Sequence, residues 1–394
     1  MILRHFGRKS HSLGKCVSIA APNELIERKI LFMAIHTKGK IAVALSGGVD
    51  SAVTAALLLE EGWEVIGATL QFYSEQSGLG TNAASAPECA RRVAEHLGIK
   101  HFVVDFIGNF EKLVLRPAWD EYSSGRTPCP CMLCNERVKF GALLNWVRKS
   151  GCCAIATGHY ARLCRERGET KLLRGMDGNK DQSYFLAGLT QQQLQHTEFP
   201  LGGTKKTWVR EKAAELGLPA SGAKESQDVC FLQAGLSFPE TLQARFGKSE
   251  DQYKGQIGGH IVDWNGKRLA EHDGIHSFTI GQRRGVKVGT GAKAWVCRLD
   301  PETGDVHLTN DEKDLLSTDF CVAKVSWTCH SLPQLPLECE VQVRYRAKPV
   351  PATLLESPDG RIRVVLNEPA RAIAPGQAAV FYDGDRALGR GWIE

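Results

Sequence analysis

The chain has 394 residues, of which 43% are hydrophobic and 24% are charged, and its formal net charge is +5. This composition is typical of a globular protein with two or three domains, and the sequence has no apolar run of 18 residues, so it predicts no membrane-spanning helix. The 13 cysteines are spread along the chain, unlike those of a small disulfide-stabilised domain, and this favours a reducing, cytoplasmic location.

Residues 1–38 are expected to form an extension outside the folded domains. The first 40 residues carry eight Lys or Arg against two Asp or Glu, so the rest of the chain is close to neutral. Glu24 and Glu27 interrupt the apolar stretch of the extension, which argues against a secretory signal peptide. A disordered tail, an organellar transit peptide and a true start at Met33 are the alternative interpretations. Since the body is nearly neutral, RNA binding would need local basic patches.

Short apolar strands alternate with helices through the first half of the chain. Strands are predicted at Lys40–Leu45, Glu64–Leu70, His101–Phe106 and Cys153–Gly158. Between them lie helical patterns at Ala52–Glu61, Cys89–Leu97, Asn109–Tyr122 and Asn135–Lys149, and a further one follows at Thr204–Leu218. Such alternation predicts an α/β domain with a parallel sheet covered on both faces, which we place at residues 39–235.

The pattern changes after about Phe238. Turn sequences such as "WNGK", "PETGD" and "SPDGR" recur, with alternating runs such as "ECEVQVRYRA" and "RIRVVLNE" among them. This pattern predicts antiparallel β-structure. We therefore expect a small β-rich central domain at residues 236–300 and a C-terminal β-barrel at residues 301–394.

The hexapeptide "SGGVDS" (Ser46–Ser51) lies between the first strand and the first helix. Two glycines and a helix N-terminus can hold an anion with backbone N–H groups, and no Walker lysine follows. The motif resembles the PP-loop of ATP pyrophosphatases, which implies an ATP site. Asp50 could orient Mg²⁺ or cap the helix. The residues expected around ATP are Ala44, Leu45, Ser46, Gly47, Gly48, Val49, Asp50, Ser51, Leu70 and Gly158, the last two because ligands bind at the carboxyl ends of parallel strands.

Three cysteines fall within six residues in "TPCPCMLCN", and Cys230 follows in "SQDVCF". Metal binding, a structural disulfide and sulfur transfer all use this residue type. An ATP-activating loop together with paired cysteines suggests that ATP activates an amide-like oxygen, which sulfur then replaces.

The resemblance becomes specific when the motifs are taken together. The series "ALSGGVDS", "GRTPCPCMLCNERVKF", "ATGHYAR", "LLRGMDGNKDQSYFL", "ESQDVCF", "TIGQRRG", "VRYRAK" and "PGQAAVFYDGDRALGRGWI" is similar to that of bacterial-type tRNA-specific 2-thiouridylases, over about residues 38–394. The resemblance implies ATP-dependent 2-thiolation of the wobble uridine, position 34, in tRNAs for Lys, Glu and Gln. It also implies an external sulfur donor, a cysteine desulfurase or a sulfur-relay protein.

Roles for single residues follow from the matched motifs. Cys134 matches the family nucleophile and Cys230 the persulfide-carrying cysteine, and the two are expected to form a disulfide during turnover. Positions that match contacts with tRNA or the target base are Cys129, Pro130, Cys131, His159, Lys180, Asp181, Gln182, Arg344, Tyr345 and Gln377. A structural role for His159 is equally open from the residues alone. The basic segments Lys205–Lys212 and "GQRRGVK" are further places for RNA, or solvated faces.

The chain departs from the common Thr-Pro-Asn-Pro-Asp pattern before the nucleophile, since Cys129 and Cys131 replace Asn and Asp. This keeps open a [4Fe–4S] cluster on Cys131, Cys134 and Cys230, and a structural zinc site if Cys129 also ligates. Two other hypotheses are a different PP-loop ligase, which would not require the cysteine pair, and a tRNA-binding or sulfur-trafficking protein without catalysis.

Overall fold

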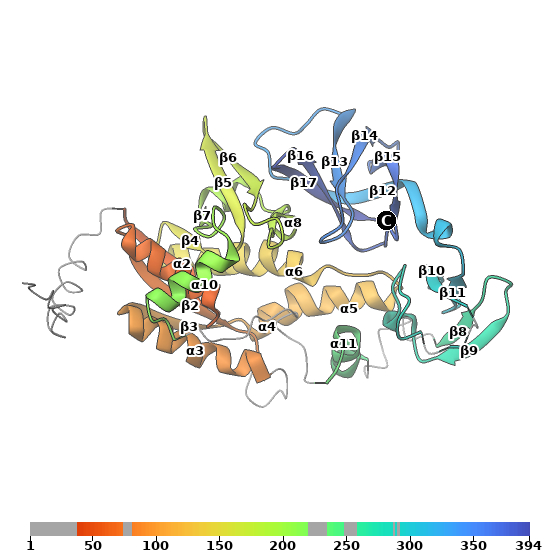
Figure 1. Cartoon of the computed structure of the whole chain (residues 1–394), viewed down its shortest axis with the longest axis horizontal. Helices are drawn as coiled ribbons and strands as arrows, with labels where there is room; N and C mark the ends of the chain where they lie inside the picture. The colour runs from red at the N-terminus through yellow and green to blue at the C-terminus, as the bar shows by residue number, and fades with distance from the viewer. Residues whose placement is uncertain (1–37, 74–80, 220–234, 248–257, 287, 290–291) are drawn as a thin grey trace, which may run out of the picture.

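A computed structural model describes residues 38–73, 81–219, 235–247, 258–286, 288–289 and 292–394, without the side chains of residues 81–85. In Figure 1 the α/β domain lies at the left, the central β-domain at the right and the C-terminal barrel above the helices that run between them. Within these ranges no helix is both long and apolar enough to cross a membrane.

The first domain is built on a five-stranded sheet in the order β3-β2-β1-β4-β7. All its pairings are parallel, which confirms the expected α/β class. The strands are β1 (Lys40–Ala44), β2 (Glu64–Gln71), β3 (Lys100–Asp105), β4 (Ala154–Ala156) and β7 (Thr197–Glu198). The strand β7 was not predicted because two residues carry no periodic pattern.

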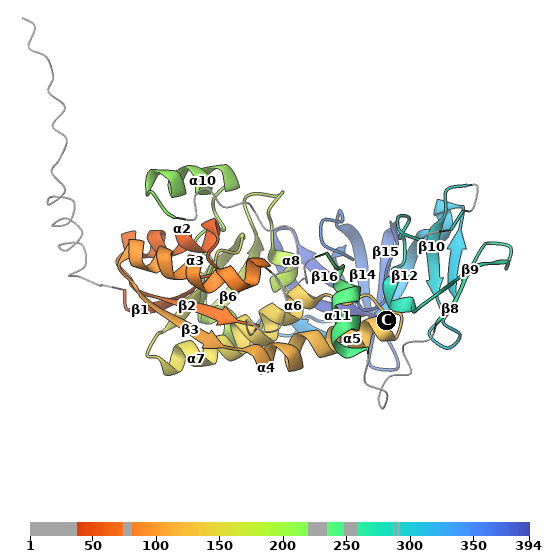
Figure 2. The ribbon, with the colours of Figure 1, turned by 90° about the horizontal axis from the view of Figure 1, so that it is seen from below.

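Side chains of β1 alternate between the two faces of the sheet. Ile41 and Val43 pack with α2 (Val49–Glu60), α3 (Thr81–Leu97) and α10 (Lys206–Glu215). On the other face, Ala42 shares a core with a helical region made of α4 (Ile107–Phe110), η2 (Glu111–Leu115), α5 (Arg116–Ser123), α6 (Pro130–Leu133), η3 (Cys134–Leu143) and α7 (Leu144–Lys149). Figure 2 shows α2 and α10 on one side of the sheet and α4 and α7 on the other. The helix of the glycine turn and the helix of Cys134 therefore cover opposite faces.

The β-rich region begins with a helix, which the β prediction from Phe238 onward missed. This helix, α11 (Phe238–Phe246), starts with a capping box in which Ser237 and Glu240 bond each other's backbone N–H. The central sheet follows, in the order β10-β11-β8-β9, with strands β8 (Gly259–Val262), β9 (Arg268–His272), β10 (Trp295–Leu299) and β11 (Val306–Thr309). A short helix, η4 (Ile275–Ser277), packs on α5.

The C-terminal domain is the expected β-barrel. Its strands are β12 (Leu316–Trp327), β13 (Leu337–Gln342), β14 (Val350–Glu356), β15 (Ile362–Arg371), β16 (Ala378–Asp383) and β17 (Arg386–Ile393). They pair in the order β12-β15-β14-β13-β16-β17, and β12 also pairs with β17, which closes the barrel. Closure removes exposed strand edges. The strand β13 ends at Gln342, so the "RYR" part of the expected strand lies instead in a turn, with Arg346 at φ 63°.

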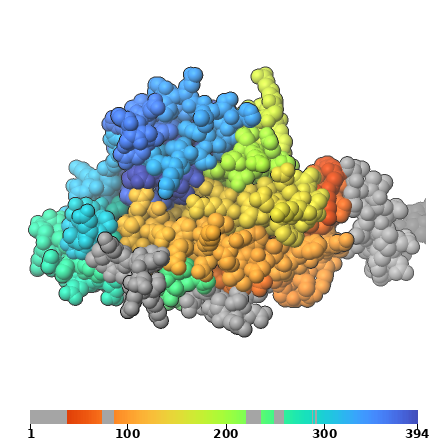
Figure 3. Space-filling view, turned by 180° about the vertical axis from the view of Figure 1, so that it is seen from behind, coloured from red at the N-terminus to blue at the C-terminus, as the bar shows by residue number. Residues whose placement is uncertain are grey.

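A hairpin of the first domain joins this barrel. It consists of β5 (Ala161–Glu166) and β6 (Glu169–Arg174), and β6 pairs with β17 through Leu172 and Leu173. The short helices α8 (Ser183–Leu186) and α9 (Gln191–Gln195) contact β6. Figure 3 shows the blue surface of the barrel resting directly on the orange and yellow surface of the first domain. The two domains therefore share one continuous sheet, although they are far apart in sequence.

Candidate active site

The glycine turn joins β1 to α2. Gly47 has φ +76°, and a Cβ built there would lie 2.6 Å from the Cβ of Cys89 and 3.0 Å from the carbonyl oxygen of Ala86. Only glycine fits this conformation and this close approach to α3. Gly48 is the N-cap residue of α2 and has no side chain to bond the first N–H groups. These N–H groups therefore remain directed toward the turn, where an anionic ligand fits.

The two serines of the motif close the turn. The hydroxyl of Ser51 donates to the carbonyl oxygen of Gly48 (3.0 Å) and accepts from the backbone N–H of Ser46 (3.2 Å). Gly158 lies against the first turn of α2, since a Cβ there would be 2.8 Å from the Cβ of Asp50. The end of β2 lies beside the start of the glycine turn. The hydroxyl of Thr69, the residue before Leu70, donates a hydrogen bond to the carbonyl oxygen of Leu45 (2.7 Å). The structure thus brings the expected ATP-binding positions together.

Asp50 is held by two residues that sequence reasoning did not assign to it. The ammonium of Lys206 lies 2.5 and 2.7 Å from its carboxylate oxygens, and the Tyr160 hydroxyl donates to it at 2.7 Å. Asp50 is not the N-cap of α2, so the capping alternative was wrong. Lys206 belongs to Lys205–Lys212, which was expected to bind RNA or to form a solvated face, but it is only 7% exposed because α10 packs against α2. No local sequence signal distinguishes it from its exposed neighbour Lys205.

The cysteine segment runs from an irregular loop into α6 and η3. Cys129 is buried, and burial, with a smaller contribution from Cys131, raises the pKa of its thiol. A thiol that stays protonated is a poor nucleophile and a poor metal ligand. Cys131 is half-buried on α6, and Cys134 begins η3 and is 5% exposed. Cys134 is thus about as buried as Cys129, and it differs from Cys129 in standing at the start of a helix.

The second expected cysteine, Cys230, lies outside the described residues. The proposed disulfide with Cys134 and the iron–sulfur ligand set are therefore not described by the structure. Among the described residues, which include Cys129, Cys131 and Cys134, no group of three or more His, Cys, Asp or Glu is placed to hold a metal ion.

His159 lies in an aromatic core. Its Nδ1 is 2.6 Å from the hydroxyl of Thr157, and its ring lies 6.0 Å from that of Phe140 and 5.9 Å from that of Phe199. Burial, and to a smaller extent Lys139, lowers the pKa of its imidazole. Only 9% of the residue is exposed, so the geometry favours the structural interpretation of His159.

We expect His159 to make the protein less stable in acid. Its pKa in the folded state lies below the value of about 6.5 in the unfolded state, so the unfolded chain binds the proton more readily. The free energy of unfolding should fall by up to about 1.4 kcal/mol per pH unit below about pH 6.5. Urea denaturation between pH 5 and 7 should show a flatter profile for His159→Gln than for the exposed control His330→Gln. Equal slopes in both variants would contradict this assignment.

The "NKDQ" stretch forms a turn held by its own side chains. The carboxylate of Asp181 accepts bonds from the N–H groups of Gly175 (2.8 Å) and Ser183 (3.0 Å) and from the Ser183 hydroxyl (2.9 Å). Gln182 accepts the N–H of Tyr160 through its side-chain oxygen (3.0 Å). The side chains of Asp181 and Gln182 therefore stabilise this turn through hydrogen bonds to backbone N–H groups, and Lys180 precedes them in the chain.

The remaining expected RNA positions lie on the C-terminal barrel. Arg344 is exposed in the turn after β13. The ring of Tyr345 lies 4.4 Å from that of Phe185, whose carbonyl oxygen accepts the side-chain amide of Asn135 (3.0 Å). Gln377 bonds the loop before Cys129. The C-terminal barrel thus reaches the cysteine segment through Gln377.

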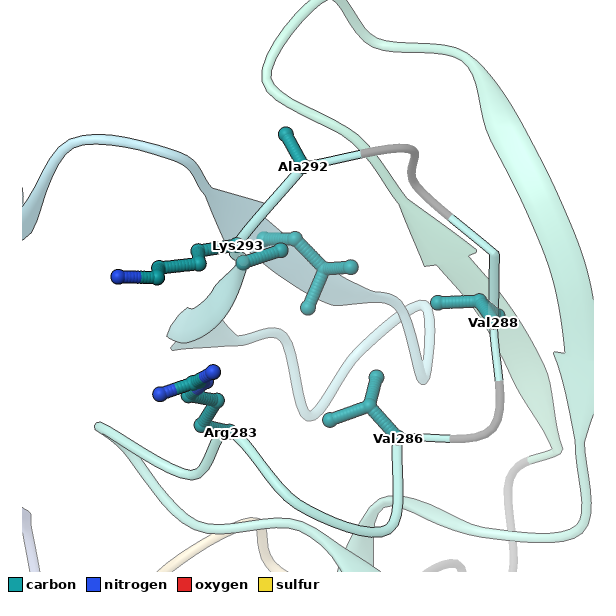
Figure 4. A pocket seen from close by; sticks show the side chains of 7 residues that line it. Arg283, Val286, Val288, Ala292 and Lys293 are labelled. Carbon is teal, nitrogen blue, oxygen red and sulfur yellow. The ribbon is translucent and has the colours of Figure 1, made fainter.

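A hollow lies in the central domain, away from the glycine turn. It has a volume of about 420 Å³ and is lined by Val286, Val288 and Leu308 among others. Figure 4 shows the side chains of Arg283 and Lys293 on the same side of it. Both are exposed, so Arg283 of the "GQRRG" stretch and Lys293 place positive charge at this hollow.

A parallel sheet with a glycine turn at a helix N-terminus defines a HUP-type, PP-loop nucleotide-binding domain, here followed by two β-domains. Family models match the three parts: a tRNA methyl transferase HUP domain at residues 39–234, a tRNA methyl transferase PRC-barrel domain at 251–310 and an aminomethyltransferase β-barrel domain at 317–393. The chain belongs to the family of tRNA-specific 2-thiouridylases, which confirms the resemblance seen in the sequence.

Relatives of that name match nearly the whole chain. The protein of Nostoc punctiforme is 41% identical, with 90% of this chain and 99% of the relative covered. That of Geobacter metallireducens is 42% identical, with 92% and 98% covered. Among solved structures, a 4-thiouridine synthetase–RNA complex with bound ATP is 19% identical, covers 54% of this chain and 55% of its own, and has a TM-score of 0.36.

Proposed function

We propose that this chain catalyses ATP-dependent 2-thiolation of the wobble uridine, position 34, of tRNA. The observation that carries the proposal is identity of 41–42% to tRNA-specific 2-thiouridylases over at least 90% of the chain. The names of the domain models mention methyl transfer, but the full-length relatives are named for thiolation. The cysteine segment beside the C-terminal barrel supplies thiols, which a thiolation reaction needs.

The reaction proceeds in two stages. The O2 atom of uracil attacks the α-phosphorus of ATP at the glycine turn, and pyrophosphate leaves. A persulfide on Cys230 then attacks C2, the C2–O bond breaks, and AMP leaves with the oxygen. The thiolate of Cys134 attacks the sulfur of Cys230, which releases 2-thiouridine and forms a Cys134–Cys230 disulfide. Alternatively, Cys134 first liberates the persulfide sulfur as sulfide, which attacks C2. An external thiol must reduce the disulfide before the next turnover.

Several finer assignments belong to the same proposal. Mg²⁺ would accompany ATP at the glycine turn and neutralise the pyrophosphate. A cysteine desulfurase or relay protein would supply the sulfur, and tRNAs for Lys, Glu and Gln would be the substrates in the cytoplasm. A [4Fe–4S] cluster on Cys131, Cys134 and Cys230 remains the alternative to the persulfide. The domain bounds follow the sequence assignment: an extension at 1–38 and domains at 39–235, 236–300 and 301–394.

The direct test is reconstitution with purified protein. Incubation with ATP, Mg²⁺, a tRNA for Glu and a persulfide-loaded desulfurase should yield 2-thiouridine at position 34, detected by mass spectrometry of the digested tRNA. Pyrophosphate release without thiolation would indicate a different PP-loop ligase. Anaerobic purification followed by iron and acid-labile sulfide analysis distinguishes the two sulfur mechanisms, since the persulfide route predicts less than one iron per chain.

Lys206 should matter for the ATP step. In Lys206→Met the carboxylate of Asp50 loses its cation and stands as an uncompensated negative charge beside the site for phosphates. We expect the apparent KM for ATP in pyrophosphate release to rise by about tenfold, which corresponds to roughly 1.4 kcal/mol. The matched control is Lys205→Met, which changes the exposed neighbouring lysine. An equal effect of both variants would show that Lys206 acts only through net charge.

A further inference from the structure

The loop that precedes α6 in the cysteine segment is bonded by residues of the C-terminal barrel. Pro128 and Pro130 lack an N–H group, so the loop before α6 has few donors with which to form a turn. Its carbonyl groups must find donors elsewhere. In the structure those donors come from the C-terminal barrel, about 250 residues later in the sequence.

Gln377 supplies the donors at the N-terminal end of the segment. Its side-chain Nε2 donates to the carbonyl oxygens of Thr127 (3.1 Å) and Pro128 (3.0 Å). Two carbonyl acceptors fix the orientation of the amide, because only its nitrogen can donate. The N–H of Thr127 in turn donates to the carbonyl oxygen of Pro375 (2.7 Å). Gly376, at φ +87°, allows this contact, since a Cβ there would lie 2.9 Å from the Thr127 carbonyl oxygen.

A second contact with the barrel holds the segment on the other side of Cys134. Glu136 and Arg390 form a bidentate ion pair at 2.9 and 2.7 Å, with side chains only 11% and 8% exposed. The guanidinium of Arg390 also donates to the carbonyl oxygen of Lys324 (2.6 Å). Gly188 leaves the space for this pair, because a Cβ there would lie 1.6 Å from the Glu136 carboxylate. The cysteines therefore lie between two fixed points on the barrel.

We infer that Gln377 is a positioning residue for the cysteine segment, acting through the carbonyl groups of Thr127 and Pro128. The inference rests on the proposed function insofar as the segment carries the reactive thiol. It assigns the C-terminal barrel a part in the chemistry besides any RNA contact. It also gives the side-chain amide of Gln377 a use within the protein, whereas the family resemblance implies a contact with tRNA.

Loss of the Gln377 bonds should loosen the segment without undocking the barrel. The Glu136–Arg390 pair stays in place, as does the bond from the Tyr184 hydroxyl to the carbonyl oxygen of Ala378 (2.9 Å). A buried thiol reacts with alkylating agents through local opening of the structure. Removing two hydrogen bonds should increase that opening by about tenfold.

The test measures thiol reactivity in the protein without tRNA. The variants are Gln377→Ala and Gln377→Glu, which replaces the donor by an acceptor of similar shape, and the control is the exposed Gln334→Glu on the same barrel. Iodoacetamide labelling of Cys131 and Cys134 is followed over pH 6–9 by mass spectrometry of the tryptic peptide 127–137. We expect labelling of Cys134 about tenfold faster in both Gln377 variants and unchanged in the control.

Two further readouts separate positioning from RNA contact. At saturating tRNA, thiolation should be slower in the Gln377 variants, while the Kd for tRNA stays within about twofold of wild type. Labelling rates equal to wild type would overturn the inference. A Kd for tRNA raised about tenfold with unchanged labelling would assign Gln377 to RNA contact instead. If wild type does not thiolate tRNA, the proposed function fails, but the labelling result still decides the positioning role.

Discussion

Replacing Cys134 by serine is expected to reduce 2-thiouridine formation by about 10³-fold or more while ATP-dependent pyrophosphate release continues. A serine hydroxyl is not ionised near neutral pH and does not exchange with a persulfide, so the sulfur-transfer stage has no nucleophile. The adenylation stage uses the glycine turn and needs no thiol. Both stages are measured in one reaction, by a coupled pyrophosphate assay and by mass spectrometry of the tRNA nucleosides.

Two further cysteine variants make this experiment decisive. Cys230→Ser should reduce 2-thiouridine formation as much as Cys134→Ser if both thiols act in the same reaction pathway. The matched control is Cys129→Ser in the same segment, a thiol that carries no sulfur in the proposed reaction, so activity should change only a few-fold. A Cys134→Ser protein that still thiolates tRNA would exclude the proposed chemistry.

Breaking the buried ion pair between the first domain and the barrel should have the largest effect on stability. In Arg390→Met the carboxylate of Glu136 stays buried without its partner, which costs about 3–5 kcal/mol. The double variant Glu136→Gln/Arg390→Met also removes the unpaired buried carboxylate and should recover part of the lost free energy of unfolding. Urea denaturation, followed by tryptophan fluorescence, gives the free energy of unfolding for each protein.

An exposed pair on the same barrel is the control for this prediction. Arg363 and Asp319 form an ion pair with side chains 54% and 40% exposed. Arg363→Met should change the free energy of unfolding by no more than about 1 kcal/mol, because water screens exposed charges. If Arg390→Met were as mild as Arg363→Met, the barrel would not be held to the cysteine helix by this pair.

The local features of the α/β domain could be predicted from the sequence. Lys40–Leu45 was expected to be a strand because its apolar residues are typical of a buried parallel strand, and the structure has β1 at Lys40–Ala44. The glycine turn followed from two adjacent glycines between a strand and a helix, and Gly47 has the positive φ that such a turn requires. The helix α11 was missed because turn-rich sequence around it outweighed the capping signal of Ser237 and Glu240.

By itself the sequence determined the strand–turn–helix unit, the helices around it and the three cysteines at the start of a helix, because each depends on neighbours within about ten residues. Only the tertiary structure decided that Lys206 pairs with Asp50, that β6 continues the barrel through β17, and that Gln377 bonds the loop before Cys129. These contacts join residues far apart in the chain. Which residues meet in such contacts depends on how whole domains pack. Residue periodicity reports only local structure and therefore does not predict these pairs.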